Sequence, residues 1–137
     1  MTNLILVAHG RLAPETKASL EMIYGACPQA LCVTFLPSEG FDTVRDKIAD
    51  ILPREGETLI IADLFGGTPF NAACAVAMGE HAHAVEVISG MSLPLLLEAA
   101  ALSQDTGAAD MATQLTAASA CIVRRFAPEA VADDDEL

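Results

Sequence analysis

The sequence predicts an α/β fold, a mostly parallel open sheet with helices on both faces. Short apolar runs alternate with longer segments whose apolar residues recur at helical spacing. The runs are too short for buried helices and end at polar residues or glycine, as strands of a parallel sheet do. A chain of 137 residues suits one domain with a single core. Strand–helix alternation at this spacing favours right-handed crossovers between parallel strands.

Four apolar runs are expected to be the strands. The first ends at His9-Gly10, and the others are rich in β-branched or large apolar residues. The expected strands cover residues 3–8, 30–36, 58–63 and 84–88.

Five segments are expected to be helices, each with a start or stop signal. Gly25 and Pro53 end the first two, Thr68 caps the third with Pro69 at its first helical position, and Ser92 caps the fourth. The expected helices cover residues 12–24, 41–52, 69–78, 93–102 and 108–118. The segment 121–126 fits either a short edge strand or an extension of the last helix.

Composition and charge exclude several classes of function. The formal net charge of −12 makes nucleic acid and anionic lipid poor partners and suits a basic protein. No apolar run approaches the roughly 18–20 residues of a membrane span, and the N-terminus has no basic signal-peptide region. We therefore expect a cytoplasmic domain at 1–126, without direct membrane insertion, followed by a solvated acidic tail at 127–137.

The cysteines show no metal-ligand spacing and no CxxC pair. They are expected to be buried or half-buried reduced thiols of a cytosolic protein. These residues are Cys27, Cys32, Cys74 and Cys121. No metal site is expected.

Three features fall at the carboxyl ends of the expected strands, where ligands gather in such folds. His9 follows the first strand, Asp63 ends the third, and a Gly66-Gly67-Thr68 loop opens the next helix. A glycine-rich helix N-terminus offers free N–H groups to an anion, and Thr68 adds a hydroxyl. A histidine oriented by a carboxylate presents its other ring nitrogen as a nucleophile. Together these groups suit phosphoryl transfer to and from His9.

Each feature alone has an ordinary structural interpretation. A histidine at a strand end is usually a hydrogen-bonded polar residue, an aspartate before a helix is usually a cap, and a glycine-rich loop serves any strand-to-helix turn. The functional interpretation depends on their coincidence at one edge. His81 and His83 lie in the loop before the fourth strand and take the ordinary interpretation.

The sequence resembles the IIA component of the mannose family of the bacterial phosphoenolpyruvate-dependent sugar phosphotransferase system. The similarity extends over about residues 3–125. The block IADLFGGTPFNAA is the specific one, and LVAHG with EMIYG and VEVISGMSLPLLLE keep the family's order and spacing. These blocks stand at 61–73, 6–10, 21–25 and 85–98.

The resemblance implies a cytosolic phosphoryl carrier. Members accept a phosphoryl group from the phosphocarrier protein HPr on the histidine matching His9 and pass it to a IIB component. The aspartate matching Asp63 orients the ring, and the positions matching Gly66, Gly67 and Thr68 hold the phosphoryl oxygens. No metal or other cofactor is implied.

The resemblance also implies an assembly. Members are homodimers whose antiparallel last strand, here at 121–126, is shared at the dimer interface. They work with IIC and IID membrane components, through which the chain is expected to associate with the membrane. Because the sequence turns to an acidic tail, its IIB is expected on a separate chain.

Three alternatives stay open to different degrees. The phosphoryl-donor subunit of dihydroxyacetone kinase shares the histidine, but typically has serine where Gly10 stands. A response-regulator receiver needs Mg²⁺ and an acidic pair after its first strand, where this chain has His9-Gly10. A non-catalytic regulatory module that binds an anion would have a similar loop. The sequence does not name the sugar.

Overall fold

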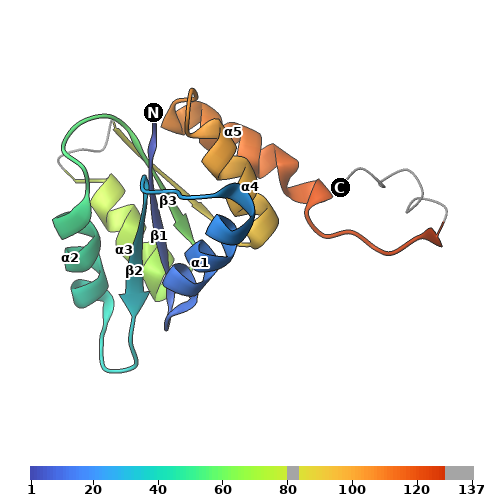
Figure 1. The fold of residues 1–137 in the computed structure, drawn as a ribbon. Helices are drawn as coiled ribbons and strands as arrows, with labels where there is room; N and C mark the ends of the chain where they lie inside the picture. Colours follow the sequence, from blue (N-terminus) through green and yellow to red (C-terminus); the bar gives the residue numbers. More distant parts are fainter. Residues whose placement is uncertain (80–83, 129–137) are drawn as a thin grey trace.

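A computed structural model describes residues 1–79 and 84–128 of the chain. Within these residues four parallel strands form one sheet in the order β2-β1-β3-β4. The strands are β1 (Asn3–His9), β2 (Ala30–Phe35), β3 (Thr58–Ala62) and β4 (Val85–Ser89). The predicted α/β fold with a parallel sheet is confirmed (Figure 1).

In the described part of the chain five α-helices connect and follow the strands, and each predicted helix is present. The first residue of every strand and helix lies within one residue of its predicted position. The helices are α1 (Leu12–Tyr24), α2 (Phe41–Ile51), α3 (Thr68–Ala77), α4 (Leu93–Leu102) and α5 (Ala108–Ala118).

One predicted cap is confirmed and one is wrong. The Ser92 side chain accepts a hydrogen bond from the N–H of Leu95 at the start of α4. At the start of α3 the cap is Gly67, whose carbonyl accepts from the N–H of Asn71 at 2.9 Å. Thr68 is therefore the first helical residue, and its hydroxyl is not used in capping.

The helices cover the two faces of the sheet separately (Figure 1). On one face α1, α4 and α5 pack against the sheet, and on the other face α2 and α3 do so. Successive residues of β1 and β3 point alternately to these two faces. Leu4, Leu6 and Ala8 of β1 face the first group, whereas Ile5 and Val7 face the second. A strand buried on both faces explains why its sequence is continuously apolar.

The strand order places a topological switch point between β1 and β3. From β1 the chain first moves to β2 on one side, and then to β3 on the other. In open parallel sheets ligands bind at the carboxyl ends of the strands beside this point. His9 ends β1, and Asp63 directly follows β3.

The segment 121–126 is not a strand in the single chain. Ser119–Cys121 forms a 3-10 turn that continues α5, and the chain then leaves the body of the fold (Figure 1). A strand needs a hydrogen-bonded neighbour, which one copy does not supply here. Of the two predictions for 121–126, an extension of the last helix is right for Cys121. A strand is not formed there in the single chain.

The cysteines differ in exposure. Cys27 is buried, Cys32 and Cys74 are half-buried, and Cys121 is exposed, contrary to expectation, because it ends the 3-10 turn beyond the core. None of these thiols forms a disulfide. Burial raises the pKa of the Cys27, Cys32 and Cys74 thiols, which favours their neutral form.

Several expectations concern parts of the chain outside the described ranges. His81, His83 and residues 129–137 of the expected acidic tail lie there. Among residues 1–79 and 84–128, no helix is long and apolar enough to cross a membrane, and no cluster of potential metal ligands occurs.

Candidate functional site

His9 and Asp63 meet at the carboxyl edge of the sheet, as predicted. One carboxylate oxygen, Oδ2 of Asp63, lies 2.9 Å from Nδ1 of His9 and accepts the backbone N–H of the same residue at 3.0 Å. A carboxylate can only accept, so Nδ1 carries the proton and Nε2 holds the lone pair. The His9 side chain is 49% exposed and that of Asp63 is 11% exposed. The pair therefore presents a nucleophilic nitrogen on a fixed ring.

The other oxygen of Asp63 is buried without a hydrogen-bond partner among the described residues. An unpaired buried acceptor destabilises a fold by roughly 1–3 kcal/mol. The carboxylate is therefore held here by its two bonds to His9 and not by a network of its own.

Phe35 supports the His9 ring from β2. The two ring centroids are 5.3 Å apart with an interplanar angle of 60°, an edge-on contact. The N–H of Gly10 donates to the carbonyl of Phe35 at 2.7 Å, and Gly10 has a φ of 59°, which suits glycine. Phe35 cannot be recognised as a neighbour of His9 from the sequence, because the pairing of the two residues follows only from the register of β1 and β2.

The glycine loop approaches the histidine closely. A Cβ built on Gly67 would lie 3.3 Å from Cε1 of His9, so a side chain there would press on the ring. Gly66 has a φ of 80°, which turns the chain into α3. The N–H of Gly67 already donates to the carbonyl of Leu64 at 3.2 Å. Gly67 therefore supplies space beside the ring.

Several donors remain at this helix start. The N–H and hydroxyl of Thr68 and the N–H of Gly66 have no partner within the described part of the chain. The N–H groups of a first helical turn and its positive dipole end favour an anion. Arg11, two residues after His9, is exposed and adds a cation. The arrangement thus combines a nucleophile with groups suited to a phosphoryl anion.

Apolar side chains surround this edge. Leu12, Leu64 and Phe65 are exposed by 45%, 58% and 76%, while Met91 is half-buried. The ring of Phe65 packs on Phe70 of α3 with centroids 4.7 Å apart. Exposed apolar patches of this kind mark contact surfaces.

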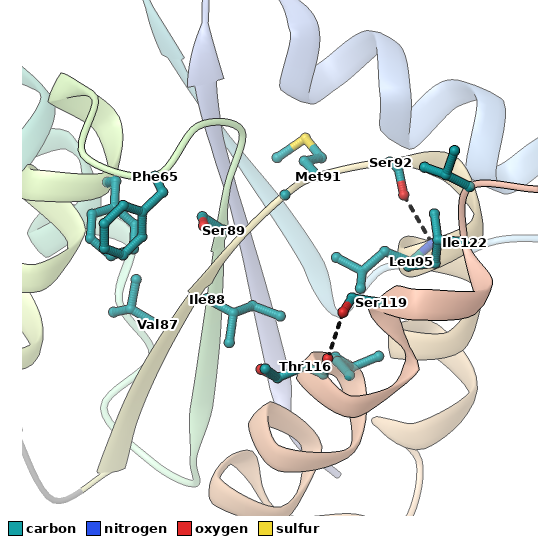
Figure 2. Close-up of a pocket in the computed structure, with 14 residues that line it drawn as sticks. Phe65, Val87, Ile88, Ser89, Met91, Ser92, Leu95, Thr116, Ser119 and Ile122 are labelled. Carbon is teal, nitrogen blue, oxygen red and sulfur yellow. Dashed lines mark hydrogen bonds between the residues drawn. The ribbon is translucent and has the colours of Figure 1, made fainter.

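A groove runs between the exposed edge strand β4 and α5, and no sequence signal predicted it. It has a volume of about 590 Å³. Its walls include Val87, Ile88 and Met91 on one side and Thr116 and Ile122 on the other (Figure 2). At one end Phe65 lines it, so the groove adjoins the histidine edge (Figure 2).

Comparison with known proteins identifies the family. A family model described as the fructose IIA component of the phosphotransferase system matches residues 3–116. The chain belongs to this family of phosphotransferase system IIA components. The family proteins are of phosphotransferase type and carry phosphoryl groups.

Named relatives agree with this membership. The sorbose-specific EIIA component of Lacticaseibacillus casei is 37% identical, over 82% of this chain and 81% of that protein. The fructose-specific EIIA component of Bacillus subtilis is 33% identical, over 87% of this chain and 82% of that protein. The predicted membership of the mannose and sorbose group of IIA components is confirmed.

A solved structure agrees as well. The mannose/sorbose-specific IIA subunit from Enterococcus faecalis superposes with a TM-score of 0.82 at 37% identity. The match covers 92% of this chain and 95% of that one.

Proposed function

We propose that this IIA component accepts a phosphoryl group from phospho-HPr on Nε2 of His9 and passes it to a IIB component. The observation that carries the proposal is the carboxylate–imidazole pair at the switch point of the sheet. Nε2 attacks the phosphorus of the donor phosphohistidine, and the bond from phosphorus to the donor nitrogen breaks. The proton on Nδ1 stays there, and Asp63 stabilises the cation that develops on the ring.

The loop would hold the phosphoryl oxygens. The available donors are the Thr68 hydroxyl and N–H and the N–H of Gly66, whereas Gly67 contributes by leaving room for the ring. Charge-assisted hydrogen bonds of this kind are about twice as strong as neutral ones. The donor is already an activated phosphohistidine, so the reaction as proposed needs no cofactor.

The deciding experiment is labelling by phosphoenolpyruvate, enzyme I and HPr. The wild-type chain should become labelled, His9→Ala should not, and His81→Ala and His83→Ala should label normally. A regulatory module that only binds anions would take up no phosphate in any of these forms. Normal labelling of His9→Ala would refute the assignment of the acceptor.

The docking surface for HPr is proposed at the apolar edge around His9. The acidic chain, with a net charge of −12, would attract a basic partner over long range, so association should slow as salt rises. Leu12→Glu is the suitable test because Leu12 starts α1 and does not line the groove, unlike Phe65. A transfer rate unaffected by this change and by salt would place the docking surface elsewhere.

A homodimer is proposed through the groove beside β4. The strand is an edge of the sheet, and unpaired edges invite pairing. Val123 and Phe126 are 89% and 74% exposed in the single chain and could be covered by a second copy in a two-fold dimer. Deleting residues 121–137 should give monomers or aggregates, whereas deleting 129–137 should leave the dimer. A full-length mass near 14.3 kDa by light scattering would refute it.

The sugar-transport role is favoured over the dihydroxyacetone kinase role. The relatives are named for sorbose, fructose and mannose, and none of these names the kinase. Phosphoryl transfer to a purified IIB component, but not to a kinase, is the expected outcome. IIC and IID would then complete the transporter in the membrane.

A further inference from the structure

The side chain of Asn71 reaches back from α3 into the glycine loop. Its Nδ2 donates to the carbonyl of Gly66 at 3.2 Å, and its own N–H donates to the carbonyl of Gly67 at 2.9 Å. One residue thus bonds two consecutive carbonyls of the loop. The Nδ2 bond is not part of the helix, because regular helices are closed by the backbone alone.

These bonds fix the peptide between Gly66 and Gly67 at both ends. Its carbonyl is held by Asn71, and its N–H is held by the carbonyl of Leu64 at 3.2 Å. Glycine has the widest conformational freedom of any residue, so two consecutive glycines need outside restraint to keep one conformation. The Asn71 side chain supplies part of that restraint.

The fixed peptide lies against the nucleophile. The Cβ position of Gly67 is 3.3 Å from Cε1 of His9, the carbon between the two ring nitrogens. A rotation of the peptide would change this contact and would turn the N–H groups of Gly66 and Thr68, which flank it. Asn71 therefore restrains both the space beside the ring and the donors proposed for the phosphoryl group.

We infer that Asn71 is a positioning residue for phosphoryl transfer, acting through the Gly66–Gly67 peptide on the surroundings of His9. The hydrogen bond of this side chain goes to the carbonyl of Gly66 and not to the ring. This inference rests on the proposed function for its kinetic consequence and on geometry alone for its effect on the ring.

Asn3 provides a matched control. Its Nδ2 also donates to backbone carbonyls, of Glu55 and Glu57, at 3.4 and 3.3 Å. These bonds lie at the amino end of β1, the far end of the strand from His9. Asn3→Ala and Asn71→Ala thus remove the same kind of hydrogen bond at opposite edges of the sheet.

The test compares these variants in transfer rate and in the NMR signal of His9 Cε1–H. Asn71→Ala should slow transfer from phospho-HPr roughly 3- to 10-fold, the equivalent of one lost hydrogen bond, and should shift the Cε1–H signal. Asn3→Ala should do neither. Asn71→Asp keeps the shape without the donor and should be slowed at least as much, and Asn71→Ser, with a shorter donor, should be intermediate.

The outcomes separate the inference from the proposed function. Equal rates and equal His9 signals in the Asn71→Ala and Asn3→Ala variants would overturn the inference, as would equal slowing of both variants. A wild-type chain that takes up no label would refute the proposed function. In that case the Cε1–H comparison alone decides whether Asn71 positions the loop, and an unshifted signal would overturn that too.

Discussion

Replacing Asp63 with asparagine tests the assignment of roles at the histidine most directly. The two side chains have nearly the same volume, but an amide has one acceptor and one NH₂ group where the carboxylate has two acceptors. Oδ2 of Asp63 accepts both Nδ1–H and the backbone N–H of His9. The asparagine must therefore choose which group faces the histidine.

Both choices are unfavourable. If the amide oxygen takes the place of Oδ2, the NH₂ group occupies the position where Oδ1 is now buried without a partner. If the amide is turned round, the NH₂ group meets the N–H of His9 and donates to Nδ1, so that the proton moves to Nε2. That tautomer has no lone pair on the nucleophile.

The loss in rate follows from the cation that forms on the ring. A carboxylate stabilises it and an amide does not, and a charged hydrogen bond contributes roughly 1.5–3 kcal/mol against about 0.5–1.5 for a neutral one. With the tautomer change, we expect transfer to slow by roughly 10²–10⁴, as in other acid-oriented histidines.

Rapid-quench measurement of transfer from phospho-HPr gives the rate, and ¹⁵N chemical shifts of His9 give the tautomer. A near-wild-type melting temperature would show that the fold is intact. A rate within about threefold of wild type would refute the reasoning, because another group would then have to orient the ring.

Three further outcomes are expected. Thr68→Ala should reduce transition-state stabilisation by about 1–3 kcal/mol, measured as kcat/KM with phospho-HPr, and no change would remove the hydroxyl from the site. Cys27 should alkylate only on unfolding, as followed by mass spectrometry, because its thiol is buried in the core, and alkylation of the native protein would contradict that burial. The hydrogen bond from Lys47 lowers the pKa of Glu39, so this pair contributes stability that is present above the ordinary pKa of a glutamate and lost as pH falls through the lowered pKa. Glu39→Gln should therefore flatten that part of the acid-unfolding curve, and an unchanged curve would contradict the role of the pair.

The sequence was sufficient for the fold because local signals and tertiary needs agree. The apolar residues of β1 are buried alternately on two faces, so the strand had to be continuously apolar. Gly25 stops α1, and Ser92 starts α4 with a side-chain hydrogen bond. Such signals act over a few residues and can be recognised without knowing the rest of the chain.

The errors arose where the determining partner is distant or belongs to the backbone. Gly67 is the N-cap of α3 because the Gly67 carbonyl accepts the first hydrogen bond of the helix. Thr68 is a good capping residue type, but it is already helical. At 121–126 apolar residues favour a strand, but a strand needs a hydrogen-bonded neighbour that the single chain does not supply, so a strand shared between two subunits stays a prediction. The contact of Phe35 with His9 likewise depends on strand register.

The juxtaposition of the candidate site residues was predictable from the sequence, whereas the hydrogen bonds that connect them were not. His9, Asp63 and the glycine loop were expected at one edge, and the structure places His9 within bonding distance of Asp63 and against the loop. That Asp63 binds the backbone as well as the ring could not be predicted, because it requires the register of β1 and β3.

The two hydrogen bonds that Asp63 accepts from His9 explain how an exposed histidine can remain oriented. A half-exposed side chain normally changes rotamer freely, and each new partner would have to order it again. Here one carboxylate oxygen of Asp63 binds both the ring and the backbone N–H of His9. The Phe35 ring contacts the imidazole on a second side, and the backbone of Gly67 lies close to it on a third. Under the proposed function the chain meets a phosphoryl donor and then an acceptor, so its nucleophile must be accessible to both. Restraint of the ring from within the chain leaves Nε2 available to either partner, with little ordering left to be done in each encounter.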